Sequence, residues 1–193
     1  VLNRTPRDYD IGTNALPRMV ESFFEHTLDV GREFGVVIVN IDDESFEVAT
    51  FRREGRYSDG RRPDEVHFTG LKEDALRRDF TINAMYWNPN SGRLIDETGG
   101  LADLRDGTIR AVGSPVRRFR EDHLRIIRAV RFAARLNFDL DPATREAIRR
   151  HVSLTTDVAA ERLQQELRVI LTDRAPASAL RLMDGLGMLS ELF

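Results

Sequence analysis

Two aspartates near the start of the sequence, Asp8 and Asp10, have the spacing of metal ligands. Side chains alternate between the faces of a strand, so residues two positions apart share a face and lie about 7 Å apart. Glu47 lies between Phe46 and Val48 in a second predicted strand, where an acid is costly unless it is paired or bound to a metal. A D-x-D pair alone is most often a turn or a cap. Because Mg²⁺ prefers carboxylate and phosphate oxygens, the three acids together predict a site for divalent metal ions.

The stretch Glu121–Phe132 carries a second set of candidate residues. At about 100° per residue, its acids and arginines fall on one side of a predicted helix, so we expect an arginine-rich face turned outward. One interpretation is a solvated helix laced by ion pairs such as Glu121 with Arg125, each worth a few tenths of a kcal/mol. The other is that Asp122 and Arg125 present an acceptor and a donor to the edge of a nucleobase, and Arg128 on the same face is counted with them.

The composition is that of an ordinary globular protein, with 41% hydrophobic and 32% charged residues. No apolar run approaches the ~20 residues of a membrane-spanning helix, and no signal peptide opens the sequence. The absence of cysteine excludes disulfides and thiolate metal sites. We therefore expect a cytoplasmic protein with no membrane and no disulfide partner. Of the 29 basic residues only Lys72 is a lysine, yet the net charge is −3, so any contact with RNA or nucleotides should be local.

Hydrophobic periodicity and turn signals predict the elements that position these residues. The first two-thirds of the sequence predict mixed strands and helices, and the last third predicts helices alone. Strands are expected at Asp8–Ile11, Val36–Val39, Phe46–Phe51, Val66–Thr69 and Thr108–Val112, with hairpin turns at 42–45 and 88–92. Helices are expected at Pro17–His26, Lys72–Arg78, Arg120–Leu136, Pro142–His151, Ala159–Leu171 and Ala177–Leu192.

Turn and cap residues predict where these elements are divided. Ser114-Pro115 and Asp141-Pro142 have the pattern of an N-cap followed by a proline in the first turn, and we expect a domain boundary near residue 114. The segment Arg52–Glu65 has five arginines, two glycines and no apolar periodicity. It predicts an exposed, mobile loop that closes over a nucleotide or an RNA primer. The alternative is a solvated loop without such a role.

Four motifs occur in the order used by the class II tRNA nucleotidyltransferase and poly(A) polymerase family. They are the aspartate pair, the run Leu76–Met85, the stretch Glu121–Phe132 and the segment Glu161–Glu166. The resemblance covers the whole sequence. It implies an α+β fold in which a polymerase-β-like nucleotidyltransferase palm, built on a mixed sheet, precedes an all-α neck. The expected domains are a head (1–113), a neck (114–175) and the start of a helical body (176–193).

The resemblance implies a catalytic role for the three acids. Asp8, Asp10 and Glu47 would hold two Mg²⁺ ions, which activate the RNA 3′-hydroxyl and neutralise the triphosphate for in-line transfer with release of pyrophosphate. In the family, a strand and a glycine turn that cradles the triphosphate precede the aspartates. This sequence starts at Val1, after the place where that turn belongs. We therefore expect a head-and-neck fragment without the first strand and its turn.

The other motifs receive binding and structural roles by resemblance. Arg78, Asp79 and Asn83 resemble the residues that position the sugar and distinguish ribose from deoxyribose, although by pattern alone Asp79 is the cap of a turn. The segment Asp96–Gly100 resembles a hinge between head and neck. Residues Glu161–Glu166 resemble a neck motif that supports the nucleotide-binding helix, so we expect a structural role for Glu161, Arg162 and Glu166.

The chemistry of the bases connects Asp122 and Arg125 to particular nucleotides. Cytosine and adenine each present an exocyclic amino donor beside a ring-nitrogen acceptor, which matches a carboxylate beside a guanidinium. Uracil and guanine present the reverse order, and each mismatched buried polar group costs on the order of 1–3 kcal/mol. A pair of this kind is expected to accept CTP and ATP and to reject UTP and GTP.

The expected activity is template-independent addition of CMP and AMP from CTP and ATP, or of only one of the two, to the 3′ end of tRNA. The nearest alternative is a bacterial poly(A) polymerase with the same head. Those enzymes often carry two basic residues where this sequence has Glu33 and its neighbours, so Glu33 favours tRNA. A further alternative is a non-catalytic module that binds RNA or nucleotides. The intact acids argue against it, and the missing triphosphate turn argues for it.

Overall fold

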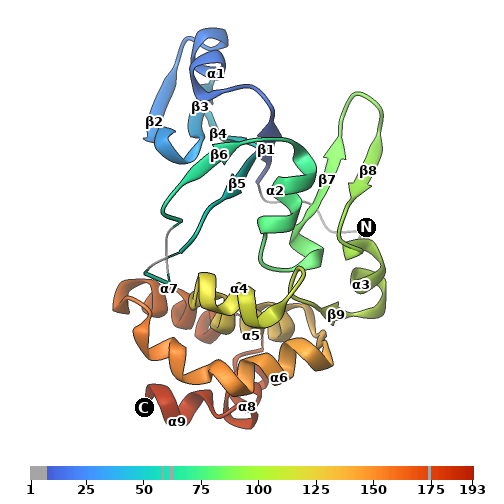
Figure 1. The fold of residues 1–193 in the computed structure, drawn as a ribbon, viewed down its shortest axis with the longest axis vertical. Helices are drawn as coiled ribbons and strands as arrows, with labels where there is room; N and C mark the ends of the chain where they lie inside the picture. Colours follow the sequence, from blue (N-terminus) through green and yellow to red (C-terminus); the bar gives the residue numbers. More distant parts are fainter. Residues whose placement is uncertain (1–7, 58, 61–62, 174) are drawn as a thin grey trace. The chain divides into compact units, whose positions relative to one another are not determined.

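A computed structural model describes residues 8–57, 59–60, 63–173 and 175–193, and the side chain of residue 32 lies outside the description. The chain forms two compact units. The first consists of Val1–Gly55 and Glu65–Asp74, and the second of Arg56–Asp64 and Ala75–Phe193. Each unit has its own hydrophobic core, and each is described separately below, with the element labels of Figure 1.

A four-stranded mixed sheet forms the centre of the first unit. Its strands are β1 (Asp10–Thr13), β2 (Thr27–Gly31), β3 (Val36–Ile41) and β4 (Glu44–Thr50), in the spatial order β1-β4-β3-β2. β1 runs parallel to β4, and the other neighbours are antiparallel. The hairpin between β3 and β4 was predicted. It turns through Asp42, whose positive φ of 53° is a conformation that aspartate tolerates.

Helix α1 (Pro17–Phe23) covers one face of this sheet. Val20 packs against Val37, Val39 and Val48, and these four side chains form the buried core of the unit. The valines of β3 alternate with less buried neighbours, as expected for a strand with one buried face. The helix is shorter than the predicted Pro17–His26, because Phe24 already has extended backbone angles.

The prediction of an exposed loop over Arg52–Glu65 is wrong at its N-terminal end, whereas the strand predicted directly after it, at Val66–Thr69, is present. β5 (Arg52–Glu54) pairs with β6 (Val66–Phe68) in an antiparallel hairpin, and a further bridge joins Tyr57 to Pro63. Arg52 also forms an ion pair with Glu54, at 3.0 Å. Backbone hydrogen bonds therefore form this strand. The polar side chains of the segment show no apolar periodicity, so the sequence pattern did not reveal it. Residues 58, 61 and 62 of the predicted loop lie outside the described residues.

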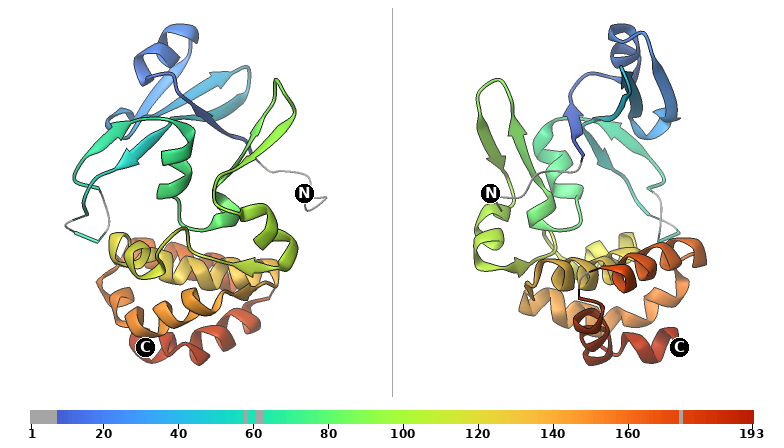
Figure 2. Two further views of the ribbon diagram at one scale, coloured as in Figure 1. Left: turned by 45° about the vertical axis from the view of Figure 1, so that its right-hand side comes forward. Right: turned by 180° about the vertical axis from the view of Figure 1, so that it is seen from behind.

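The second unit begins with small elements that surround a short 3-10 turn. They are the end of α2 (Leu71–Arg77), the turn η2 (Thr81–Asn83), the hairpin of β7 (Met85–Asn88) and β8 (Arg93–Asp96), and α3 (Gly100–Asp106). β9 (Thr108–Ile109) pairs in parallel with β10 (Asp139–Leu140). Both views in Figure 2 show the β7–β8 hairpin running from η2 to α3. The hairpin turn at 88–92 was predicted, and the strand predicted at Thr108–Val112 is shorter.

Helices make up the rest of the second unit. They are α4 (Pro115–Glu121), α5 (Leu124–Leu136), α6 (Pro142–His151), α7 (Ala160–Thr172), α8 (Pro176–Gly185) and α9 (Met188–Leu192), with the 3-10 segment η3 (Val152–Asp157). Ser114 and Asp141 accept hydrogen bonds from Arg117 and Thr144 backbone N–H groups, respectively, at the starts of α4 and α6. Both predicted caps are thus confirmed. The element order also confirms the predicted α+β fold, with a mixed sheet followed by helices.

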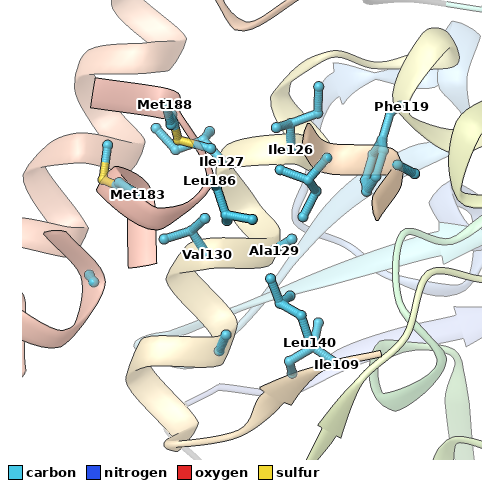
Figure 3. Close-up of a cluster of buried hydrophobic side chains, with 14 of the residues drawn as sticks. Ile109, Phe119, Ile126, Ile127, Ala129, Val130, Leu140, Met183, Leu186 and Met188 are labelled. Atoms are coloured by element: carbon cyan, nitrogen blue, oxygen red, sulfur yellow. The ribbon is translucent and has the colours of Figure 1, made fainter. Parts of the chain in front are cut away.

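The core of the second unit is built around α5. Ile126, Ile127 and Val130 are fully buried, and they meet Phe119 from α4 and Met183 from α8 in the cluster shown in Figure 3. These positions form the apolar face that the sequence predicted for this helix.

Two long predicted helices are each broken in two. The helix predicted at Arg120–Leu136 breaks at Asp122, whose φ of −140° is extended. The helix predicted at Ala177–Leu192 breaks at Gly187, whose φ of 77° is left-handed. The aspartate side chain can bond to nearby backbone groups in place of the helical hydrogen bonds. The glycine can adopt a left-handed conformation without steric cost. Apolar periodicity continues across both breaks, which explains why the pattern missed them.

The two compact units are defined by which residues pack together. The boundary predicted near residue 114 marks instead the change from mixed strands and helices to helices alone. The division into head, neck and body therefore remains a prediction. Within the described ranges, no helix combines the length and the apolar character needed to cross a membrane.

Candidate functional site

The predicted metal ligands lie at the first strand pair of the mixed sheet. Asp10 of β1 stands directly opposite Glu47 of β4 in the parallel ladder. Opposite residues in a ladder point to the same face. The next pair is Ile11 with Val48, and Val48 belongs to the core beneath α1. Asp10 and Glu47 therefore lie on the face of the sheet that α1 leaves open.

Asp8 and Glu47 depart from the prediction in two respects. Asp8 precedes β1 and is not part of the ladder, because the strand begins at Asp10 and not at Asp8. Glu47 is exposed, so the expected cost of burying its charge does not arise. Among the described residues, no three His, Cys, Asp or Glu side chains gather closely enough to hold a metal ion. The ladder therefore brings together Asp10 and Glu47, and Asp8 is adjacent in sequence only.

Asp79 is the centre of a second constellation. Its Oδ1 accepts hydrogen bonds from the backbone N–H of Phe80, at 2.8 Å, and from Asn83 Nδ2, at 3.1 Å. Its Oδ2 accepts from Arg128 Nε at 2.9 Å and lies 2.7 Å from Arg128 Nη2. The carboxylate of Asp79 thus joins two other candidate residues, one from the turn η2 and one from α5.

Arg78 extends from the same turn in another direction. Its guanidinium lies over the ring of Tyr86, 4.9 Å from the ring centre, and its Nε donates to the Tyr86 hydroxyl at 2.9 Å. Its Nη1 donates to the backbone carbonyl of Asn83 at 3.2 Å. Arg78, Asp79, Asn83 and Arg128 therefore form one connected set of polar groups.

Backbone pairing fixes the segment that carries Asp79. Thr81 N–H donates to the carbonyl of Arg110 at 2.9 Å, and Val112 N–H donates to the carbonyl of Asp79 at 3.0 Å. The buried hydroxyl of Thr81 donates to Asp103 Oδ2 at 2.7 Å. These bonds tie the segment to the residues that follow β9 and to α3, so the carboxylate of Asp79 starts from a rigid backbone.

Arg125 is buried, with 8% of its surface exposed, and not turned outward as predicted. Its Nη1 donates to the carbonyl of Arg118 at 3.2 Å and to Glu121 Oε2 at 3.0 Å. Its Nη2 donates to the carbonyl of Arg77 at 3.2 Å. At Arg125 the predicted arginine face is therefore covered by the end of α2, because buried guanidinium groups need acceptors and the last carbonyls of a helix supply them.

The buried arginines beside Glu121 differ in their electrostatics. Burial lowers the pKa of Arg118, and Glu121 only partly offsets this. Burial also acts to lower the pKa of Arg125, but Tyr57, Asp122 and Glu121 outweigh it and raise that pKa above the ordinary value. Arg125 is therefore a donor that stays charged although it is removed from water.

Asp122 lies in the break between α4 and α5, not on a shared helix with Arg125. Its Oδ1 accepts from the backbone N–H of Leu124 at 3.2 Å. Arg162 of α7 donates to both of its oxygens, with Nη1 at 3.1 Å from Oδ1 and Nη2 at 3.0 Å from Oδ2. The structure therefore pairs Asp122 with Arg162, a partner 40 residues away that local spacing gave no reason to choose.

A count of hydrogen-bond capacity shows what this pair of residues leaves open. A carboxylate oxygen accepts about two hydrogen bonds and a guanidinium has five N–H groups. Counted over the described residues alone, Oδ2 of Asp122 keeps one acceptor position beside Arg162, and Arg125 keeps its Nε–H and one Nη2 hydrogen. One free acceptor and free donors are the groups needed to read a base edge.

Glu166 is a further buried group that the sequence marked only as structural. Its Oε1 lies 3.7 Å from Arg128 Nη1 and its Oε2 lies 3.0 Å from Arg131 Nε, although the second pair lacks hydrogen-bond alignment. Burial raises the pKa of Glu166, and the two arginines partly offset this. Glu166 is therefore a second acidic neighbour of Arg128, in addition to Asp79. The sequence feature that could have indicated this role is an acidic residue at a position of the predicted helix that faces the core.

Comparison with known protein families covers most of the chain. The profile of a family described as "Poly A polymerase head domain" matches residues 1–110. The profile described as "Probable RNA and SrmB- binding site of polymerase A" matches residues 137–193.

Curated relatives and solved structures agree with these matches. The CCA-adding enzymes of Bacillus licheniformis and Bacillus subtilis are 45% and 46% identical over 99% of this chain. The chain spans about half the length of these relatives, 48% in each case. A crystal structure of the Bacillus stearothermophilus CCA-adding enzyme in complex with CTP matches 96% of this chain and 45% of its own, with 40% identity and a TM-score of 0.87. The Thermotoga maritima CCA-adding enzyme complexed with tRNA matches 95% of this chain and 43% of its own, with 29% identity and a TM-score of 0.76.

Proposed function

Because the chain belongs to the family of the poly A polymerase head domain, we propose that it transfers nucleotides to RNA 3′ ends, adding CMP and AMP from CTP and ATP to tRNA. The relatives named above support tRNA as the acceptor, since they carry the name CCA-adding enzyme over nearly the whole of this chain. A tRNA acceptor would place the reaction in the cytoplasm.

The observation that carries the proposal is that, among the described residues, Asp122 keeps one open acceptor and Arg125 keeps open donors. Cytosine and adenine bring a donor beside an acceptor, so both match this pair. Uracil and guanine would set a carbonyl against the carboxylate and an N–H against the guanidinium. The unpaired groups would cost on the order of 1–3 kcal/mol each, so the protein itself supplies the choice that a template strand supplies elsewhere.

The connected set around Asp79 is proposed to bind the rest of the nucleotide. Asn83 and Arg78 would contact the ribose hydroxyls, and Arg128 would hold the carboxylate of Asp79 in place through its two bonds. A sugar without the 2′-hydroxyl would leave one buried polar group without a partner, which disfavours deoxyribonucleotides.

We propose a site for divalent metal ions at Asp10 and Glu47, on the face of the sheet that α1 leaves open. Asp10 and Glu47 are exposed, lie in register on one face, and offer the carboxylate oxygens that Mg²⁺ prefers. We assign these two residues and Asp8 as ligands for two Mg²⁺ ions, with phosphate oxygens of the substrate completing the coordination. When bound, such ions lower the pKa of an attacking hydroxyl and neutralise a triphosphate.

The direct test is incubation of the purified protein with tRNA that lacks its CCA end and with each labelled nucleoside triphosphate in turn. We expect incorporation from CTP, then from ATP on tRNA ending in CC, and none from UTP or GTP. Intact tRNA ending in CCA is the matched control and should not be extended.

Two results would overturn this assignment. Long tails made from ATP alone on any RNA would identify a poly(A) polymerase. Binding of nucleotides without any incorporation, in the presence of Mg²⁺, would identify a non-catalytic binding module.

A further inference from the structure

Arg162 is the partner that both oxygens of Asp122 share. The two charge-assisted bonds, of 3.1 and 3.0 Å, join α7 to the break between α4 and α5. Side-chain exposure is 24% for Arg162 and 17% for Asp122, so the pair is largely shielded from water. Bidentate pairs of this kind fix the plane of a carboxylate as well as its position.

The geometry of the bonds decides which part of Asp122 remains available. Oδ1 is filled by Leu124 N–H and Arg162, and within the described part of the chain Oδ2 carries a single bond, from Arg162. A carboxylate without Arg162 could rotate and would offer several acceptor positions in several directions. With Arg162 in place, one acceptor position faces one direction.

We propose that Arg162 is a specificity-determining positioning residue: it sets the orientation of the Asp122 acceptor and thereby the discrimination of cytosine and adenine from uracil and guanine. The inference rests on the proposed function, since it concerns the residue that reads the base. It goes beyond a supporting role for this helix, because it assigns Arg162 an effect on selectivity and not only on stability.

Other contacts of α7 already account for its attachment to the unit. Ile170 is buried in the core, Leu163 and Leu167 pack against the same cluster, and Glu166 pairs with the arginines of α5. Arg162 lies near the start of the helix, and its side chain is more exposed than that of Glu166, 24% against 9%. Loss of its guanidinium should therefore leave α7 folded and release the carboxylate of Asp122.

The test compares Arg162→Gln, Arg162→Lys and the wild-type protein. We expect Arg162→Gln to lower the ratio of kcat/KM for CTP over UTP by about tenfold, the order of discrimination that one bidentate contact provides. Arg162→Lys keeps the charge but not the planar fork, so it should recover only part of the ratio. The matched control is Arg168→Gln, an exposed arginine on the same helix, which should leave the ratio unchanged.

A second measurement separates positioning from folding. If Arg162 acts through Asp122, then Arg162→Gln should have no further effect on the ratio in an Asp122→Ala background. Thermal melting of each variant checks the fold, and equilibrium binding of CTP and UTP reads selectivity without turnover.

The possible outcomes distinguish this inference from the proposed function. A wild-type protein that prefers CTP, together with an Arg162→Gln protein that keeps the same ratio at a lower rate, overturns the positioning role and leaves the function intact. An effect of Arg162→Gln that persists in the Asp122→Ala background also overturns it. A wild-type protein with no preference for CTP in either assay overturns the proposed function and this inference together.

Discussion

At the scale of single residues, Asp122 and Arg125 owe their directions to their neighbours. A free arginine samples many rotamers, and ordering it costs roughly 2 kcal/mol. Here three acceptors, the carbonyls of Arg118 and Arg77 and the carboxylate of Glu121, have already ordered Arg125. A base that binds beside it meets a preorganised donor, and binding energy is not spent on fixing the side chain.

The first prediction concerns Arg125→Ala. Removal of the guanidinium takes away the donor that opposes the ring N–H of uracil and guanine. The preference for CTP and ATP should therefore fall by about ten- to a hundredfold, in line with roughly 1–3 kcal/mol for a bidentate contact. The measurement is kcat/KM for all four nucleotides.

The control for this variant is Arg117→Ala. Arg117 bonds to the same Glu121 carboxylate, but its side chain is 71% exposed, so its loss should leave the ratios unchanged. If Arg125→Ala slowed all four nucleotides equally, Arg125 would be a phosphate-binding or structural residue.

A second prediction concerns the acidic face of the sheet. Asp10→Asn removes one charge from the register pair with Glu47, and we expect nucleotide transfer to fall by more than about 100-fold, since even outer-shell partners of metal ligands cost 10- to 100-fold. Mg²⁺ titration of the residual activity is the check. Asp43→Asn, at an exposed position in the β3–β4 turn of the same unit, is the matched control. An equal loss of activity in that variant would mean that the overall negative charge of the unit, and not metal binding by Asp10, causes the effect.

How far these residues could be predicted depends on the range of the interaction. Strand periodicity, which is local, predicted a shared face for Asp8 and Asp10, but β1 begins only at Asp10. Glu47 was predicted to lie in a neighbouring strand, and the ladder places it opposite Asp10. The bond from Asp122 to Arg162 spans 40 residues and depends on how α7 packs. The prediction that Arg125 faces outward was wrong for the same reason. Periodicity identifies a polar face of a helix but not the acceptor groups that cover it.

At the scale of elements, the break between α4 and α5 is the feature that periodicity could not predict. The apolar pattern continues through Phe119 and Ile126, yet Asp122 adopts extended angles and its side chain accepts the N–H of Leu124. A short aspartate competes with the helix for such bonds. The caps at Ser114 and Asp141 were predicted, because cap chemistry acts within three residues.

Asp96 shows how one side chain secures the predicted hinge segment Asp96–Gly100. Its Oδ1 accepts from Thr98 and Gly100 N–H, and its Oδ2 accepts from Leu101 N–H at 2.8 Å. The backbone of Gly100 lies so close to Thr81 that a Cβ at Gly100 would be 2.1 Å from the carbonyl oxygen of Thr81. The start of α3 thus depends on a carboxylate and a glycine together.

The third prediction is a pH-dependent loss of stability in this segment. Burial acts to raise the pKa of Asp96, but hydrogen bonds from backbone N–H groups outweigh it and hold the pKa below its ordinary value of 3.8. Because the unfolded chain binds the proton more tightly, the stabilisation is present above the unfolded pKa and is lost as the pH falls through the lower folded pKa.

The variant that tests this is Asp96→Asn. It removes one acceptor oxygen and the charge, so we expect a loss of about 1 kcal/mol in the free energy of unfolding at neutral pH. The difference from wild type should shrink as the pH falls below about 4. Urea denaturation at a series of pH values measures it. Asp106→Asn, at the exposed C-terminal end of the same helix, should show no such loss, and a pH-independent difference for Asp96→Asn would contradict the assignment.

At the scale of the whole molecule, the two compact units have cores of unequal size. The core of the first unit is the small valine cluster beneath α1. The core of the second joins α4, α5, α6, α7, α8 and α9. The chain passes between the units near residues 55, 64 and 74, which no composition shift marks. Separate cores with no shared member predict that local stability differs between the units.

The last prediction is that the units unfold in separate transitions, the first unit at the lower temperature, because it buries less apolar surface. Ile127→Ala removes a fully buried side chain from the second core and should cost about 2–5 kcal/mol there. Val37→Ala acts on the first core, where the loss of two methyl groups should cost on the order of 1–2 kcal/mol. Each variant should move only its own transition in differential scanning calorimetry, and the exposed Arg168→Ala should move neither. A single transition that both core variants shift would mean that the units fold as one cooperative structure.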